Sequence, residues 1–135
     1  MLNPVAHALV SNGAFVARGY SGDIGHLTGL IVEALKHRGF SFLDVFQPCV
    51  TVNYLNTYDW YKERAYKLEE ERHDVTDRGK ALEKAFEWGD RIPIGIFYQE
   101  ERPTYRDGLP HLAGIPLVRQ KLENVDITAL MEDLT

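Results

Sequence analysis

The pattern that most constrains the fold lies between residues 14 and 46. An apolar run, AFVAR (14–18), predicts a buried strand. The next segment, IGHLTGLIVEALKH (24–37), carries apolar residues at helical spacing, and Gly39 is placed to end that helix. A second apolar run, FSFLDVF (40–46), predicts another strand. Strand, helix and strand form a βαβ unit, so the sequence predicts two parallel strands joined by a right-handed crossover.

The flanking segments predict further elements around this unit. NPVAHALVSNG (3–13) is typical of a short helix, because Asn3 is a good N-cap and Pro4 suits the first turn. Farther along, the sequence predicts a helix at 56–74, a second helix at 75–90 and a strand at 91–99. An irregular stretch at 100–119 and a terminal helix at 124–134 follow. The expected caps and inward-facing residues of the two helices are Thr57, Thr76, Leu82, Ala85 and Phe86.

Composition narrows the class of protein. The chain has 135 residues, 44% of them hydrophobic and 26% charged, which is typical of one globular domain. A net charge of −5 gives no support for binding nucleic acid or an anionic membrane surface. No apolar run approaches the roughly 20 residues that span a bilayer. The start, MLNPVAHALV, lacks the pattern of a signal peptide, and one cysteine cannot form an internal disulfide, so we expect a cytoplasmic protein.

The turn RGYSGDIG (18–25) resembles two motifs, and neither fits. A nucleophile elbow, G-x-S-x-G, would need glycine where Asp23 stands. A dinucleotide fingerprint would need G-x-G-x-x-G, whereas the glycines here are Gly19, Gly22 and Gly25, with Asp44 about 20 residues on. The Asp23 carboxylate would also repel a pyrophosphate at the helix N-terminus. The favoured interpretation is an ordinary turn, with Ser21 or Asp23 as the helix cap.

Metal-ligating side chains show little clustering. Five histidines occur without H-x-x-x-H or C-x-x-H spacing, at His7, His26, His37, His73 and His111. A zinc site would need such clustering as its first signal. His73, Asp74 and Asp77 form a weak candidate ligand set, for which a solvated helix start is the favoured interpretation. The aromatic residues Trp60, Tyr61 and Tyr66 lack surrounding positive charge and are interpreted as packing residues.

Cys49, in the stretch SFLDVFQPCVTVN (41–53), leaves three interpretations open. A lone cysteine after a strand is most often a buried, inert thiol. A nucleophile would need a nearby base and cation, which the sequence does not identify. A metal ligand is the third option, since Cys49 follows the carboxyl end of a parallel strand, where α/β sheets place their ligands. The local sequence favours the buried thiol.

One long stretch resembles a known family. GAFVARGYSGDIGHLTGLIVEALKHRGFSFLDVFQPCVTVN, NTYDWYKERAYKLEEERHDVTDRGKALEKAFEWGDRIPIGIFYQEERPTY and GIPLV together span nearly all of residues 3–118. They resemble the C-terminal part of the β subunit of 2-oxoacid:ferredoxin oxidoreductases, which are thiamine-diphosphate enzymes. The resemblance implies an α/β fold: residues 1–48 as the C-terminal portion of the thiamine-diphosphate-binding parallel-sheet domain, and 49–135 as a helical and irregular C-terminal extension.

The resemblance also implies an activity, cofactors and partners. The complete enzyme decarboxylates a 2-oxoacid to acyl-CoA and CO₂, and passes electrons through a [4Fe–4S] cluster to ferredoxin. Its cofactors are thiamine diphosphate, Mg²⁺ and that cluster. Its partners would be the α subunit, the N-terminal part of β, ferredoxin, coenzyme A and the 2-oxoacid, with neither nucleic acid nor membrane. The fourth cluster cysteine of the family corresponds to Cys49, which makes Cys49 the one metal ligand expected here.

The departures from the family limit this expectation. The family's C-x-x-C pair, third cluster cysteine and G-D-G…N stretch for Mg²⁺ and diphosphate do not occur in the sequence. We therefore expect a segment of the β subunit that alone holds none of these cofactors and is inactive, with no catalytic or cofactor-binding residue assigned. The alternative is a stand-alone βαβ binding or scaffold module without catalytic activity.

Overall fold

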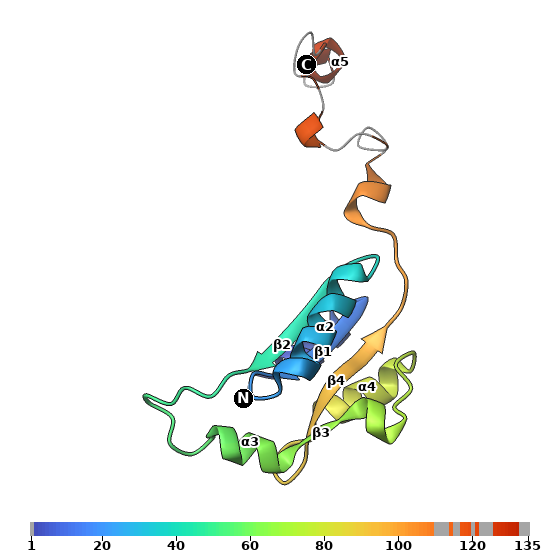
Figure 1. The fold of residues 1–135 in the computed structure, drawn as a ribbon. Helices are drawn as coiled ribbons and strands as arrows, with labels where there is room; N and C mark the ends of the chain where they lie inside the picture. Colours follow the sequence, from blue (N-terminus) through green and yellow to red (C-terminus); the bar gives the residue numbers. More distant parts are fainter. Residues whose placement is uncertain (1, 110–113, 115–116, 120, 122–125, 133–135) are drawn as a thin grey trace. The chain divides into compact units, whose positions relative to one another are not determined.

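A computed structural model describes residues 2–109, 114, 117–119, 121 and 126–132 of the chain (Figure 1). The chain divides into two compact units, Met1–Thr104 and Tyr105–Thr135, and each is described by itself. The first unit contains the predicted βαβ pattern and every strand of the described residues.

The first unit is a mixed α/β structure. Its strands are β1 (Phe15–Tyr20), β2 (Ser41–Phe46), β3 (Ala65–Lys67) and β4 (Ile92–Gln99). Its helices are α1 (Pro4–Val10), α2 (Ile24–Lys36), α3 (Tyr58–Arg64) and α4 (Arg78–Ala85), with a short 3₁₀ turn, η1 (Leu68–Glu71). Asn3, Asp23, Thr57 and Asp77 cap the four helices by accepting backbone N–H bonds.

The four strands form one sheet in the order β2-β1-β4-β3. β1 and β2 are parallel and joined through α2, as the sequence predicts. β4 pairs antiparallel with β1, and β3 pairs parallel with β4. The register between β1 and β4 shifts after Val16, which pairs with Tyr98 while Ala17 pairs with Ile96. Phe97 is therefore the extra residue of a β-bulge.

Helices cover both faces of this sheet. Side chains alternate along β1, so that Val16 packs on one face with residues of α1 and α4, while Phe15 and Ala17 pack on the other with Leu30 of α2. Figure 1 shows α2 lying along the β1–β2 pair and α4 beside β4. Every residue of β1 is buried, which explains the apolar run Phe15–Ala17 at its start.

Three expectations for the middle of the chain are wrong. The helix expected over 56–74 ends at Arg64, because residues 65–67 are extended and pair with β4 as β3. Phe86, expected to face the core, is 67% exposed, because α4 ends at Ala85 and turns Ala81 and Ala85 inward instead. The cap of α4 is Asp77, one residue beyond the expected Thr76.

The second unit contains short helical turns. They are η2 (Tyr105–Gly108), η4 (Leu117–Arg119) and α5 (Thr128–Glu132). α5 lies within the terminal helix expected over 124–134, of which 124–125 and 133–134 are outside the described residues. Among the described residues of the whole chain, no helix has the length and hydrophobicity needed to span a membrane.

The core position of Leu9 in α1 gives a test of this packing. Leu9 is 1% exposed and packs in the cluster formed by α1, α4 and the sheet. We expect Leu9→Ala to lower the free energy of unfolding by about 2–5 kcal/mol, from lost burial and the cavity left behind. Leu35→Ala is the control, because Leu35 of α2 is 81% exposed, and its effect should stay within about 0.5 kcal/mol. Urea denaturation of both variants measures the difference, and equal effects would contradict the described core.

Candidate functional site

Cys49 lies in the loop that follows β2. Pro48 before it is buried, while the Cys49 thiol is exposed. The backbone N–H of Asn53 donates to the Cys49 carbonyl at 2.9 Å, so the chain turns immediately after the cysteine. Exposed apolar side chains surround it in sequence, with Val50, Val52 and Leu55 at 66%, 75% and 82% exposure.

The expectation of a buried thiol at Cys49 is therefore wrong. Pro48 is the last buried residue after β2, and in the turn that follows it Cys49 and the next residues are exposed to solvent. Among the described residues, no group of three or more His, Cys, Asp or Glu side chains is placed to hold a metal ion. An accessible thiol at the carboxyl end of a parallel strand is suited to act as one ligand of a larger set, but the described part of the chain does not complete such a set.

The glycine-containing turn that follows β1 is capped by its own aspartate, Asp23. Asp23 accepts from the backbone N–H of His26 at 3.0 Å, and its other carboxylate oxygen lies 2.9 Å from the Lys67 ammonium. These bonds, first the one from Lys67, lower the pKa of Asp23 below its ordinary value. The helix N-terminus that a diphosphate would need is thus capped by a carboxylate, in agreement with the ordinary turn favoured from the sequence.

Asp44, the acidic residue of the rejected dinucleotide motif, has a different partner. It lies opposite Arg18 in the register of β1 and β2, and its Oδ2 accepts from Arg18 Nε at 2.9 Å. Arg18 is 3% exposed, and its guanidinium lies over the rings of Phe46 and Phe97, at 4.7 and 5.4 Å from their centroids. Burial lowers the pKa of Arg18, and the bond to Asp44 opposes that shift.

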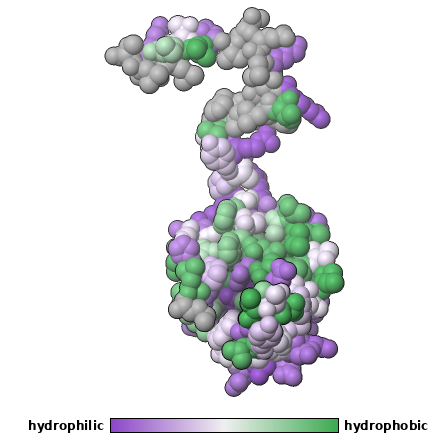
Figure 2. Space-filling view, turned by 90° about the vertical axis from the view of Figure 1, so that its left-hand side faces the viewer, coloured by the Kyte–Doolittle hydropathy of each residue, from purple (hydrophilic) through white to green (hydrophobic). Residues whose placement is uncertain are grey.

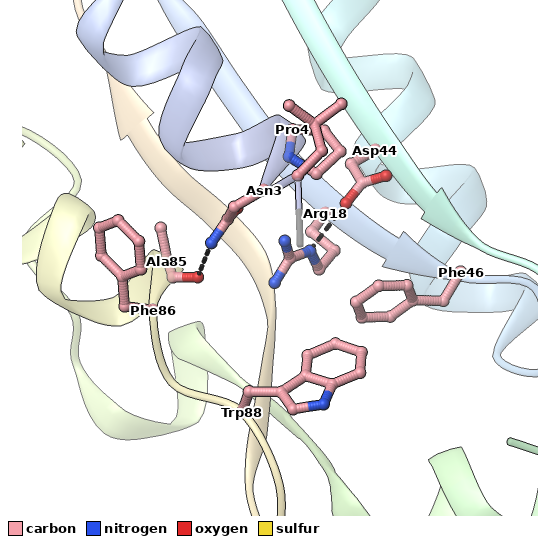
Figure 3. Close-up of a pocket in the computed structure, with 9 residues that line it drawn as sticks. Asn3, Pro4, Arg18, Asp44, Phe46, Ala85, Phe86 and Trp88 are labelled. Carbon is pink, nitrogen blue, oxygen red and sulfur yellow. Dashed lines mark hydrogen bonds and ion pairs between the residues drawn. The ribbon is translucent and has the colours of Figure 1, made fainter.

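A cavity of about 390 Å³ opens beside this ion pair, and we name it the Arg18 cavity (Figure 3). Its lining residues come from the start of the chain, from β1 and β2 and from the end of α4: Leu2, Asn3, Pro4, Arg18, Asp44, Phe46, Ala85, Phe86 and Trp88. Figure 3 shows Arg18 among them, bonded to Asp44, and the Asn3 side chain bonded to the Ala85 carbonyl, at 2.6 Å. Most of the lining is apolar or aromatic.

Aromatic side chains pack next to the cavity. Phe46 stacks on Tyr61 at 5.0 Å between ring centroids and meets Trp88 edge-on at 5.7 Å. Trp60 in turn contacts Tyr61 and Trp88. Trp60 and Tyr61 are packing residues, as the sequence indicates. Tyr66, on β3, also packs against the core, and its hydroxyl donates to Glu87 and accepts from Lys84.

The histidine and aspartate candidates have local structural partners. A ring nitrogen of His73 lies 2.8 Å from the Phe97 carbonyl, Asp74 accepts from Thr76, and Asp77 caps α4. The contacts of Asp74 and Asp77 are those of a helix start, whereas the His73 ring lies within hydrogen-bond distance of strand β4. His111 lies outside the described residues.

Sequence reasoning missed Arg18 and its cavity. A signal was available, because each of the two apolar runs contains a single charged residue at the fourth position of the strand, Arg18 in β1 and Asp44 in β2. Parallel register places such positions side by side. The sequence contains no such signal for the cavity, because the residues that line it come from segments far apart in the sequence.

Comparison with known proteins gives one consistent family. The model of the C-terminal region of the pyruvate ferredoxin oxidoreductase beta chain matches residues 49–114. A 2-oxoacid:ferredoxin oxidoreductase subunit beta from a Sulfolobus species is 47% identical over 117 residues, which cover 78% of this chain and 38% of the relative. The same subunit from Saccharolobus solfataricus is 46% identical over 110 residues, 74% of this chain and 36% of the relative.

A solved structure agrees with these relatives. It is a 2-oxoglutarate:ferredoxin oxidoreductase from Magnetococcus marinus with 2-oxoglutarate, coenzyme A and succinyl-CoA bound. The match has a TM-score of 0.78 and 26% identity, and covers 99% of this chain and 45% of that one. The present chain thus spans less than half the length of each of these proteins.

The Arg18–Asp44 pair gives a test of the site. Asp44→Asn keeps the shape of the side chain but leaves the buried guanidinium without its counter-charge. We expect it to lower the free energy of unfolding by about 2–3 kcal/mol, below the usual cost of breaking a buried pair because Asp44 retains some exposure. Glu33→Gln, which removes an exposed pair with Lys36, should cost less than about 0.5 kcal/mol. Similar urea midpoints for the two variants would contradict a stabilising role for the buried pair.

Proposed function

This chain belongs to the family of 2-oxoacid:ferredoxin oxidoreductase β subunits and corresponds to a part of that subunit, and we propose that it serves the reaction of that enzyme as the C-terminal segment. The observation that carries the proposal is the 47% identity over 117 residues with the Sulfolobus subunit. A match covering 78% of the chain includes its central part, and with it the Cys49 loop.

The proposed reaction is the oxidative decarboxylation of a 2-oxoacid. The bond between the carboxylate and the keto carbon breaks, CO₂ leaves, and the remaining acyl group is joined to the coenzyme A sulfur. Two electrons are released and reduce two ferredoxins, one electron each. Thiamine diphosphate with Mg²⁺ would supply carbanion stabilisation when bound, and a [4Fe–4S] cluster would carry the electrons singly. No residue of this chain is assigned to thiamine diphosphate or Mg²⁺. The chain is proposed to supply a single ligand, one thiolate of the cluster.

Cys49 is the residue that we propose for the cluster. Its thiol is exposed, so a cluster held mainly by another segment could reach it. A [4Fe–4S] cluster takes four cysteine thiolates, whereas this chain has a single cysteine. The other three ligands would therefore come from another polypeptide segment, and the chain alone is expected to hold no cluster and to be inactive.

The partners follow from this role. We propose that the chain assembles with an α subunit and with the N-terminal part of β, and that the complete enzyme uses ferredoxin and coenzyme A in the cytoplasm.

Residues 1–48 would belong to the thiamine-diphosphate-binding domain and 49–135 to the C-terminal extension. Strands β3 and β4 of the extension join the sheet of the first segment through the pairing of β4 with β1, so the two would share one sheet. A stand-alone βαβ binding or scaffold module remains the alternative.

The first test is activity in a rebuilt enzyme. The chain is co-expressed with the N-terminal part of the Sulfolobus β subunit and with that enzyme's α subunit, and reduction of ferredoxin is followed with a 2-oxoacid and coenzyme A. We expect turnover in the rebuilt enzyme and none in the chain alone or in the mixture without it. Turnover that does not depend on adding this chain would contradict the proposed role and favour the scaffold alternative.

The second test concerns Cys49. In the rebuilt enzyme, Cys49→Ser removes one thiolate, so we expect loss of the broad iron–sulfur absorption and a fall in bound iron and acid-labile sulfide. Thr51→Ala, an exposed change two residues away, is the matched control and should leave both unchanged. Iron content and spectrum equal to those of the unaltered enzyme would remove Cys49 from the cluster site.

A further inference from the structure

The loop that carries Cys49, residues 49–56, is not held in place by burial of its own apolar side chains. Val50, Val52 and Leu55 are 66%, 75% and 82% exposed. In Figure 1 the loop extends to the left of the sheet, and Figure 2, which faces that side of the first unit, shows apolar side chains at the surface among polar ones. The conformation of the loop therefore depends on hydrogen bonds.

Asn53 makes three hydrogen bonds within the loop. Its backbone N–H donates to the Cys49 carbonyl at 2.9 Å, which closes a single helical turn directly after the cysteine. Its side-chain Oδ1 accepts from the backbone N–H groups of Leu55 at 3.1 Å and Asn56 at 3.0 Å. A side-chain oxygen that accepts from the following backbone is the usual way in which asparagine fixes a turn. Asn53 thus ties the first half of the loop to the second.

The two ends of the loop are fixed to the rest of the first unit. Pro48, directly before the loop, is buried. At the other end, the loop leads into α3, where the Tyr58 carbonyl accepts from the Tyr20 hydroxyl at 2.7 Å. Tyr20 lies in β1 and is 5% exposed, so this anchor belongs to the core. The loop is therefore a short span between fixed ends, and Asn53 lies within that span.

A cysteine thiol follows its backbone closely. A single carbon atom separates the sulfur from the Cα atom, so the backbone and one staggered rotation set the position of the sulfur. Metal ligands are held near one productive geometry by the structure around them. If the loop adopts that geometry only part of the time, the apparent affinity for the metal group falls by the same fraction. The bonds that order the loop therefore bear on how well Cys49 can act as a ligand.

We propose that Asn53 is a positioning residue for the cluster: through its three hydrogen bonds it holds the backbone of the loop so that the Cys49 thiolate is presented in one geometry. This deepens the proposed function and rests on it, since it requires Cys49 to be a cluster ligand. Asn53 acts through the backbone and through Cys49.

The first experiment uses the chain by itself. Asn53→Ala removes the Oδ1 acceptor, so we expect the Leu55 and Asn56 amides to exchange hydrogen about fivefold faster or more. Asn53→Asp keeps an acceptor oxygen and should restore the rates. Asn56→Ala is the matched control and should leave the Leu55 amide unchanged, because the structure shows the Asn56 backbone N–H, and not its side chain, bonded to Asn53. NMR of ¹⁵N-labelled protein measures the exchange.

The same experiment can overturn the proposal. Unchanged exchange of both amides in Asn53→Ala would show that the side chain does not order the loop. A lowered urea midpoint in that variant would assign Asn53 to the stability of the whole first unit, in place of the local role.

The second experiment uses the rebuilt enzyme and follows iron release to a ferrous chelator. Asn53→Ala leaves every proposed thiolate in place, so we expect the cluster to form but to release iron about fivefold faster or more. The EPR signal of the reduced cluster should broaden, because Cys49 would occupy more than one geometry. Asn53→Asp should bring the release rate back toward that of the unaltered enzyme, and Asn56→Ala should not change it.

The outcomes separate this proposal from the proposed function. Loss of the cluster in Cys49→Ser, together with unchanged iron release and an unchanged EPR signal in Asn53→Ala, would overturn the positioning role and leave Cys49 as a ligand. An intact cluster in Cys49→Ser would overturn the assignment of Cys49, and the role of Asn53 with it. Equally fast release from Asn53→Ala and Asn56→Ala would show that the effect is not specific to Asn53.

Discussion

Strand β1 is the element on which the first unit depends. It pairs with β2 along one edge and with β4 along the other, and all six of its residues are buried. Its alternate side chains also join the two helical layers, since Val16 packs with α1 and α4 while Phe15 and Ala17 pack with α2. A strand without a solvent-facing side tolerates few polar groups, because each buried polar atom needs a partner. The charge of Arg18 within β1 is therefore the main constraint on what surrounds it.

The sequence contains enough information to place that charge but not to show its surroundings. Arg18 and Asp44 occupy matching positions of two apolar runs, and a βαβ unit brings such positions together. The aromatic rings over the guanidinium come from β2 and β4, and the cavity walls come from the chain start and the end of α4. Those contacts depend on how distant segments pack, which periodicity does not describe. The βαβ unit and the cap at Asp23 were predictable, whereas the cavity was not.

The stretch from Ala65 to Glu71 shows the same limit within one element. Its charged residues at helical spacing predict continuation of the helix that begins at Tyr58. β4, however, offers unpaired backbone groups on the side away from β1, and Ala65–Lys67 pairs with it. Hydrogen bonds to a distant strand thus replace those of the local helix, and tertiary context overrides propensity. Leu68, which would lie on a helical surface, is instead fully packed in the core beside Phe97.

The exposed positions of Cys49 and of the apolar residues around it are consistent with a divided site. Exposure of the apolar side chains of Val50, Val52 and Leu55 to water is unfavourable, and neither the sheet nor its helices bury them. On the proposed function, a second segment would cover these side chains while it brings the other thiolates to Cys49. Burial of the apolar loop would then also exclude water around the cluster, and solvent exposure is one of the factors that set its reduction potential. A loop that is unfavourable in isolation would in this way become a functional part of the assembled site.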